Sequence, residues 1–576
     1  MKSNKPARPS EKAAPAPLRT LAWWHVALGG GAALGAVLLV YQPALNGPFV
    51  FDDQYLPFFS PRYAEQSLIM ATKGVRPFLM FSFWVNNRLA GIEPFTYHLW
   101  NVLLHFANSL LVFFITRRLL ALAGSQSLAR EWMAALAGAV FLLHPVQTES
   151  VAYVASRSES LSALFFYSAF TVFLYRKSEA ISWPAGAAVI LLYGAAVSTK
   201  EHTITLPAVL LLTDYFWNPG FSLKGIRRNW RLYAPLAVAA VAGIALVYRL
   251  VRGSVSAGFS VEGLPWYDYF YTQCRAMWVY FRLFLWPSGQ NVDYAYPYSR
   301  SILDHGAVFG LAGLTLLLAA AIYFRKRYPL AAYGFVAALI LFSPTSSVIP
   351  IQDAVTERRL YLPMLGLILM AVEFLRRWKA RRAVVVGSLG CVLVGLAIAC
   401  NLRTRVWASD VLLWEDSVAK SPHNSRAHFH LAVAYSQQGR CEEASNRFEI
   451  ADRLGKPDYR LFVDWALAED CAGRSDRAID KLKRAAAIQP SAYPYSLLGM
   501  IYGKQKRYQE ALAALETAEK LDPRENMTHF YRGNIYAAKG DVVKAAQEYR
   551  RAIELNPDNE AARRGLARVE AGGGQR

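Results

Sequence analysis

The chain has 576 residues, of which 54% are hydrophobic and 13% aromatic, and it carries a formal net charge of +21. Its apolar residues form long stretches between residues 21 and 401, whereas residues 402–576 are polar and rich in alanine, with no stretch long enough to cross a bilayer. Because the Lys and Arg residues lie in short runs between the apolar stretches, the positive charge indicates membrane orientation and does not support a nucleic-acid partner.

Residues 1–20 contain several Lys, Arg and Pro residues and predict a disordered cytoplasmic leader. No cleavage site follows the first apolar stretch, and further apolar stretches come after it. The first stretch is therefore predicted to be a signal anchor that remains in the protein.

Twelve apolar stretches predict helices that are near, or somewhat under, the length that crosses a bilayer. They lie at residues 21–41, 97–116, 132–148, 160–175, 183–199, 203–217, 232–251, 266–286, 303–324, 330–349, 359–375 and 383–401.

Twelve full crossings conflict with the positions of the basic runs. With a cytoplasmic N-terminus, crossings at both 232–251 and 266–286 would put the basic run at 325–327 outside. The stretch at 266–286 is crowded with Tyr and Trp and contains one Asp and two Arg residues, which is typical of an interfacial or re-entrant helix. We therefore predict an all-α polytopic membrane domain over residues 21–401, with about eleven crossings plus this one helix.

The acidic pair Asp52-Asp53 follows the first predicted helix, on the outer side in this topology. Two adjacent carboxylates at a bilayer edge can position an acceptor, take a proton from it, or hold a divalent cation. A solvated turn is the simpler interpretation of an isolated acidic pair.

Further charged and polar residues gather at the outer ends of the predicted helices. A charged group at membrane depth costs about 2.5–3.5 kcal/mol on insertion scales, so groups retained there need partners or a function. Taken singly, Glu149 with Arg157, or Lys200 with Glu201, can form salt-bridged helix ends. Together with the acidic pair, they predict a site for an anionic lipid headgroup, in which Arg and Lys hold the phosphate and an Asp faces the nucleophile. The other candidates are Arg76, His98, His144, Glu159, Glu357, Arg358 and Tyr361.

The C-terminal part repeats with a period of 33–34 residues. Each segment has a small residue early, an Ala twelve positions later and another Ala seven positions beyond that. The segments are Ser425–Lys456, Tyr459–Pro490, Ala492–Pro523 and Asn526–Pro557. This pattern resembles the tetratricopeptide repeat, a helix–turn–helix unit whose stacks form a protein-binding solenoid. We expect a connector helix over 402–424 and four repeats over 425–570, on the same outer side as Asp52 and Asp53.

Two of the five cysteines, Cys441 and Cys471, fall in the predicted repeats. Cys441 opens the second helix of one repeat and Cys471 closes the first helix of the next, and these helices should pack antiparallel. A disulfide between them would close a loop of about thirty residues and would persist only in an oxidising compartment. Two unpaired thiols at a helix seam are the alternative.

Several motifs in this order resemble one known family. They are the Asp-Asp pair, HPVQTESVAYVASRSE (144–159), STKEHTITLP (198–207), TERRLYLP (356–363) and the C-terminal repeats. Together they are similar to the transmembrane and tetratricopeptide-repeat protein O-mannosyltransferases, which are membrane glycosyltransferases of the GT-C class. The resemblance extends from about residue 20 to residue 570.

This resemblance implies a polyprenyl-phosphate sugar donor, an acidic catalytic residue in the first outer loop, and transfer to Ser or Thr hydroxyls of translocated proteins. Asp52 and Asp53 match the catalytic motif by position. The positions implied for the donor site are His144, Glu149, Arg157, Glu159, Lys200, Glu201, Glu357, Arg358 and Tyr361. The short repeat array and the absence of organelle-type signals suggest a bacterial member, with undecaprenyl phosphate as the more natural carrier and the sugar left open.

We expect an inverting glycosyltransferase that requires no cofactor and no metal, although the Asp pair leaves a divalent cation as an alternative. It would lie in the inner membrane with a cytoplasmic N-terminus and periplasmic repeats, or in the endoplasmic reticulum with luminal repeats in a eukaryote. Its partners would be the lipid-linked sugar, membrane lipid and an acceptor protein, for which the repeats offer a docking surface. The rival functions are a membrane-anchored scaffold for envelope proteins, a transferase with a lipid or glycan acceptor, and a lipid transporter.

Overall fold

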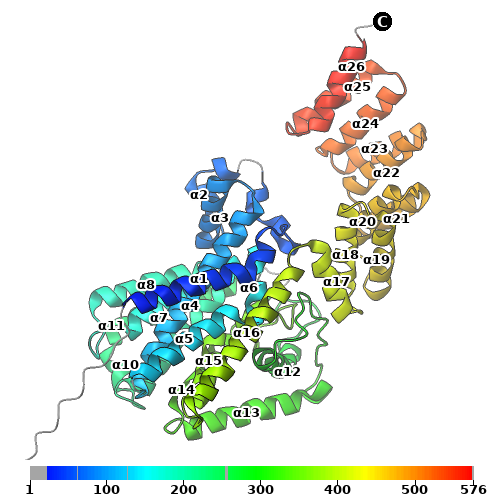
Figure 1. Ribbon diagram of the computed structural model, residues 1–576. Helices are drawn as coiled ribbons and strands as arrows, with labels where there is room; N and C mark the ends of the chain where they lie inside the picture. The colour runs from blue at the N-terminus through cyan, green and yellow to red at the C-terminus, as the bar shows by residue number, and fades with distance from the viewer. Residues whose placement is uncertain (1–22, 61–62, 126, 253–256, 574–576) are drawn as a thin grey trace, which may run out of the picture. The chain divides into compact units, whose positions relative to one another are not determined.

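The computed structural model describes residues 23–60, 63–125, 127–252 and 257–573, and every regular element in these ranges is helical (Figure 1). The predicted leader, residues 1–20, lies outside the described residues. The chain divides into two compact units, Met1–Val292 with Tyr296–Ser409, and Asp293–Ala295 with Asp410–Arg576. The protein is therefore all-α.

The first unit contains a membrane-type set of helices joined by short helical turns. Its described α-helices are α1 (Trp23–Leu45), α2 (Leu68–Ala71), α3 (Pro77–Ala90), α4 (Pro94–Leu122), α5 (Ser127–Leu143), α6 (Thr148–Ala152), α7 (Arg157–Leu174), α8 (Trp183–Val197), α9 (Leu206–Trp217), α10 (Lys224–Arg228), α11 (Trp230–Arg252), α12 (Trp266–Leu285), α13 (Ala307–Phe324), α14 (Pro329–Phe342), α15 (Met364–Leu375) and α16 (Arg382–Val406).

Each of the twelve predicted apolar stretches overlaps one of the longer helices among these. Among the described helices, four have the length and composition to cross a membrane: α1, α4, α16 and the helix over Asp304–Phe324 that includes α13. Four shorter apolar segments accompany them, in α8, α11, α14 and α15. These helices indicate a membrane protein. The sequence analysis did not predict α3, which begins at a proline and buries only part of its surface.

A polar seam runs along the long helix α4, which packs against α5 and α7. Asn101, His105 and Asn108 are buried on this helix at spacings that place them on one face. The His105 imidazole lies 2.9 Å from the Tyr361 hydroxyl, which also accepts a hydrogen bond from Asn108 at 3.0 Å. Tyr361, a predicted site residue, therefore ties the TERRLYLP segment to the helical core.

The second unit is a solenoid of paired antiparallel helices, in the order that the period predicts (Figure 1). Its described helices are α17 (Asp410–Lys420), α18 (Ser425–Gln437), α19 (Cys441–Leu454), α20 (Tyr459–Cys471), α21 (Ser475–Ile488), α22 (Ala492–Lys504), α23 (Tyr508–Leu521), α24 (Asn526–Ala538), α25 (Val542–Leu555) and α26 (Glu560–Gly573). The small residue is required by close packing, since a Cβ at Gly533 would come within 2.7 Å of the Tyr549 ring.

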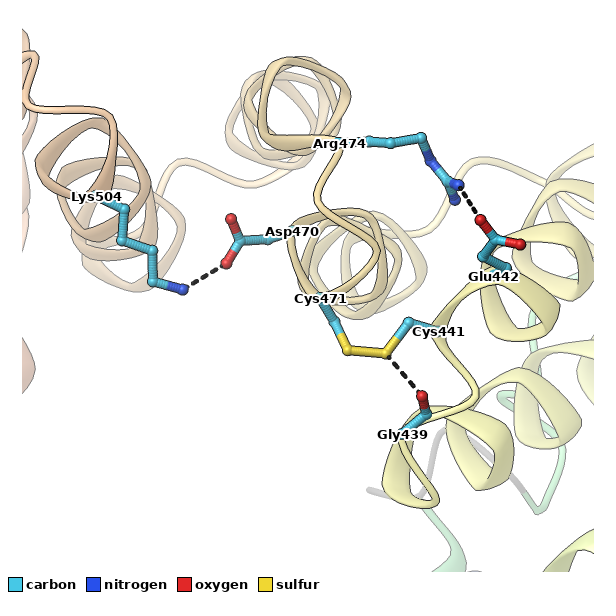
Figure 2. Close-up of a disulfide and its surroundings, with 7 residues drawn as sticks. All are labelled: Gly439, Cys441, Glu442, Asp470, Cys471, Arg474 and Lys504. Carbon is cyan, nitrogen blue, oxygen red and sulfur yellow. Dashed lines mark hydrogen bonds and ion pairs between the residues drawn. A yellow bond between two sulfur atoms is a disulfide. The ribbon is translucent and has the colours of Figure 1, made fainter.

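Cys441 and Cys471 form a disulfide that joins the start of α19 to the end of α20, with their Cα atoms 5.8 Å apart (Figure 2). Two ion pairs flank the bridge: Arg474 lies 3.6 Å from Glu442, and Lys504 lies 2.6 Å from Asp470. The bridge and the ion pairs connect successive repeats, so they stiffen the N-terminal half of the solenoid.

Replacing Cys441 and Cys471 together by serine is expected to destabilise the repeat unit. The bridge spans 30 residues, and closing a loop of that size is worth roughly 3–4 kcal/mol in the chain-entropy model. Thermal unfolding of the purified protein should show a lower midpoint for the double variant, and Cys391→Ser, at an exposed free thiol, is the control. Quantitative alkylation of both thiols in the native protein without reductant would contradict the bridge.

Candidate functional site

Asp53 is held in the interior by backbone hydrogen bonds. It lies in the 3-10 helix η1 (Phe51–Tyr55), which follows α1. Its carboxylate accepts hydrogen bonds from the N–H of Val50 at 3.1 Å and from that of Ala155 at 2.6 Å. The side chain is fully buried, and burial raises the pKa of Asp53 to about 8, against the opposing effect of these N–H groups. Asp53 therefore joins the first loop to the segment before α7.

Asp52 has the opposite environment. Its side chain is exposed, and within the described residues its carboxylate has no hydrogen-bond or ion-pair partner. Its backbone N–H donates to the Tyr153 hydroxyl oxygen at 3.1 Å. Phe51, just before it, has a positive φ of 54°, a conformation that is uncommon for a bulky residue. The loop is thus fixed through its backbone while the Asp52 carboxylate stays available.

The burial of Asp53 predicts a specific pH dependence of stability. Because the pKa rises from 3.8 to about 8 on folding, the folded state keeps a proton that the unfolded state releases between these values. The free energy of unfolding should therefore fall as pH rises toward 8 and then level off.

Thermal midpoints of the wild type and Asp53→Asn, measured between pH 5 and pH 9, test this. The wild type should lose more stability than the variant across this interval, whereas the exposed-site variant Asp52→Asn should follow the wild type. Parallel curves for wild type and Asp53→Asn would contradict the assignment.

Three cations lie at the starts of short helical segments, each beside a carboxylate. Arg76, at the start of α3, makes a bidentate pair with Glu201, with both N–O distances at 2.9 Å. The Lys200 Nζ, at the start of the 3-10 helix η6 (Glu201–Thr205), lies 2.5 Å from Glu159 in the first turn of α7.

The third cation is Arg358, in the 3-10 helix η8 (Glu357–Leu360). It contacts Glu149 twice, by its guanidinium at 2.6 Å and by its backbone N–H at 3.1 Å. The Arg358 side chain is 22% exposed and that of Glu149 only 1%. A second carboxylate, Asp353, lies 4.0 Å from the other guanidinium nitrogen. The guanidinium is therefore held between two carboxylates, and its partial exposure lets an anion reach it.

Electrostatic coupling links the three cations. Burial lowers the pKa of Lys200, Glu159 raises it, and the charges of Arg76 and Arg358 lower it further. Each cation also has a carboxylate partner, which offsets the repulsion among the three. A phosphate group would compete with these carboxylates for the cations.

Tyr153 connects the acidic pair to Arg358, and the sequence analysis did not select it. Burial raises the pKa of Tyr153, the charges of Asp53 and Asp52 raise it further, and Arg358 lowers it. The charges of the acidic pair and of Arg358 therefore all act on the Tyr153 hydroxyl. Tyr153 belongs to the HPVQTESVAYVASRSE motif but has no charge, which is why charge-based reasoning passed over it.

Arg157 is enclosed by the protein in this conformation. Its guanidinium donates to the side-chain oxygen of Asn101 at 2.9 Å, to that of Asn86 at 2.8 Å, and to the Tyr97 carbonyl at 3.1 Å. It also lies 4.6 Å from the centroid of the Phe83 ring. The side chain is 1% exposed, so these contacts indicate that Arg157 supports the site from within.

His144 and His98, two further predicted site residues, are also buried with backbone partners. His144 Nε2 lies 3.0 Å from the Phe284 carbonyl, and its Nδ1 accepts the Val146 N–H at 3.3 Å. His98 Nε2 lies 3.2 Å from the Gly47 carbonyl. These contacts fix loop conformations.

Glu357, beside Arg358, has a similar supporting position. It is buried and accepts hydrogen bonds from the Gln290 side chain at 2.8 Å and from the Asn291 N–H at 2.7 Å. It therefore anchors the loop after α12 to η8. In the part of the chain that the structure describes, no group of three or more His, Cys, Asp or Glu residues is arranged to hold a metal ion.

The sequence is similar to known proteins over most of its length. It is 23% identical over 548 residues to protein O-mannosyl-transferase TMTC3 of Mus musculus, covering 84% of this chain and 58% of that protein. It is also 23% identical over 448 residues to protein O-mannosyl-transferase F38B6.6 of Caenorhabditis elegans, covering 73% and 62%. The chain spans about three-fifths of the length of these relatives.

The C-terminal unit has matches of its own. A family model described as a tetratricopeptide repeat matches residues 496–560. Among solved structures, YrrB, a tetratricopeptide-repeat protein with an unusual peptide-binding site, is 20% identical and covers 30% of this chain and 87% of its own, with a TM-score of 0.24. The chain is thus a distant homologue of the TMTC-type protein O-mannosyl-transferases and carries tetratricopeptide repeats.

Proposed function

From this homology, we propose that the protein is a membrane glycosyltransferase that moves a monosaccharide from a polyprenyl-phosphate donor to Ser or Thr hydroxyls of exported proteins. The observation that carries the proposal is the exposed Asp52 carboxylate, which has no partner among the described residues, on a loop that hydrogen bonds of Asp53 and Tyr153 fix. The charge of Arg358 acts on the same Tyr153. A base for the acceptor and a cation for the leaving phosphate are the two groups that such a transfer needs.

In this reaction the acceptor hydroxyl oxygen attacks the anomeric carbon of the donor, and its proton passes to the Asp52 carboxylate. The bond between the anomeric carbon and the phosphate oxygen breaks, and the electron pair leaves with the polyprenyl phosphate. Arg358 stabilises the departing phosphate by its positive charge. The charges of Lys200 and Arg76, which interact with that of Arg358, assist it. A single displacement inverts the anomeric configuration, and neither a cofactor nor a metal is required in this scheme.

The proposed topology has about eleven crossings, with α12 as an interfacial or re-entrant helix. The leader, residues 1–20, is cytoplasmic, and the membrane domain covers residues 21–401. The connector at 402–424 and the repeats at 425–570 then share the outer, periplasmic side with Asp52. The basic runs at 117–118, 176–177, 227–228, 325–327 and 376–382 support this orientation, because they fall on the cytoplasmic side. A disulfide in the repeats is consistent with an oxidising compartment.

The repeats are proposed to hold the acceptor protein. Stacked helix pairs offer an extended surface for polypeptide segments, and the solenoid is attached directly to the last predicted crossing. A variant that lacks residues 425–576 should therefore retain transfer to a short free peptide and lose transfer to a folded acceptor. Equal loss on both substrates would show that the repeats serve folding instead.

The proposal is tested with the purified full-length chain in lipid vesicles, supplied with synthetic undecaprenyl-phosphate mannose and a Ser/Thr-rich peptide. Transfer of a hexose to the peptide, detected by mass spectrometry and insensitive to a chelator, is the expected result. Loss of activity on chelation would overturn metal independence. Comparison of envelope glycoproteins with and without the gene gives the cellular test, and an unchanged glycoproteome would favour the scaffold or a lipid or glycan acceptor.

A further inference from the structure

The end of α16 holds a buried tryptophan against the first loop. Trp407 caps α16, is 1% exposed, and is among the largest fully buried side chains. Its ring stacks on that of Tyr153, with centroids 5.9 Å apart and an interplanar angle of 28°. The Tyr153 hydroxyl in turn accepts the Asp52 N–H. Two contacts therefore lead from the last helix of the first unit to the backbone of Asp52.

The same tryptophan also limits the start of this loop. A Cβ at Gly47 would come within 2.7 Å of the Trp407 carbonyl, so only glycine allows this approach. Gly47 is the fifth residue before Asp52, and its own carbonyl is contacted by His98. The loop is therefore fixed near Gly47 by the Trp407 backbone and at Asp52 by Tyr153.

The Tyr153 ring is held by aromatic contacts as well as by the main chain. Besides Trp407, it stacks on Phe51, with centroids 6.1 Å apart. Aromatic pairs of this kind fix ring orientation, and the orientation of the ring decides where its hydroxyl lies. Removing the Trp407 ring would leave a space beside Tyr153, and its hydroxyl would no longer be held at the Asp52 N–H.

We propose that Trp407 and Tyr153 are positioning residues for Asp52, so that the geometry of the base depends on the end of α16. This inference rests on the proposed function, because it assigns the two residues to the same site. Trp407 touches neither acceptor nor donor and acts through Tyr153.

Activity measurements on Trp407→Leu, Tyr153→Phe and the double variant test the proposal. Each single change should lower kcat about tenfold, within the range of positioning effects, and leave KM for the donor unchanged. Trp407 is proposed to act only through Tyr153, so the two changes remove the same effect on Asp52. The double variant should therefore be no slower than the slower single variant. Trp407→Phe, which keeps a stacking ring, should restore most of the rate. Additive losses in the double variant would overturn the proposal.

Hydrogen exchange gives a readout that needs no activity. Exchange of the peptide that contains the Asp52 amide should be faster in Trp407→Leu and in Tyr153→Phe than in the wild type. Trp465→Leu, which removes a buried tryptophan from α20, is the matched control and should leave this peptide unchanged. If Trp407→Leu leaves hydrogen exchange of this peptide unchanged, the positioning role is overturned. If exchange is faster in the variants but the wild type transfers no sugar, only the proposed function is contradicted.

Discussion

Asp52→Asn is expected to lower the rate of sugar transfer by about 10²–10⁴-fold, the usual contribution of a general base. Asparagine keeps the size of the side chain and cannot take the proton of the acceptor hydroxyl. The Asp52 carboxylate is exposed and has no partner among the described residues, so its replacement should not disturb folding. Transfer assays on the variant in vesicles, at equal amounts of folded protein, provide the measurement.

Asp53→Asn is the matched comparison at the next position. Its carboxylate accepts two backbone N–H groups in the interior, and an amide can accept only one of them with its oxygen. This variant should lose about 1–3 kcal/mol of stability. Its activity per folded molecule should fall less than that of Asp52→Asn. If Asp52→Asn and the double variant both keep full activity, Asp52 is not the base.

Arg358→Ala is expected to lower kcat by about 10²–10³-fold. This is the usual effect of removing a hydrogen-bond donor that stabilises the negative charge developing on the leaving phosphate. The guanidinium is partly exposed and lies in the electrostatic field of Lys200. Arg358→Lys should restore part of the rate, because it keeps the charge but not the fork of N–H donors. The measurement is transfer as a function of the lipid-linked donor concentration.

A control separates this effect from the simple loss of an ion pair, since Arg358→Ala also leaves the buried Glu149 without its partner. The buried Glu373, at the end of α15, pairs with both Arg376 and Arg377. Replacing both arginines by alanine should therefore lower stability and leave transfer per folded molecule unchanged. Equal loss of kcat in both variants would mean that Arg358 has only a structural role.

Local sequence was enough to predict the helices and the repeat pattern. The apolar stretches contain α-helices because the length and hydropathy of a segment are properties of that segment alone. The repeat period placed α18–α25 in their pairs for the same reason, since each unit repeats one local pattern. The motif order was enough to recognise the homology to protein O-mannosyl-transferases.

The division of roles within the site could not be read from sequence. Asp52 and Asp53 are adjacent and chemically identical. Burial of Asp53 and its hydrogen bonds from the N–H groups of Val50 and Ala155, the latter 102 positions away, distinguish them. Arg358 and Arg157 were both predicted as phosphate ligands, with Arg157 assisting Arg358. The structure encloses Arg157 among amides and carbonyls and leaves Arg358 partly exposed beside Glu149.

Likewise, Tyr153 carries no charge that would single it out within its motif, and Trp407 belongs to none of the motifs, so the sequence did not reveal their contacts with the first loop. The sequence by itself thus determined the apolar helices and the repeats, because both follow from local pattern. Only the tertiary structure decided which carboxylate is available and which residues hold it, because burial and hydrogen bonding depend on contacts between residues far apart in the chain.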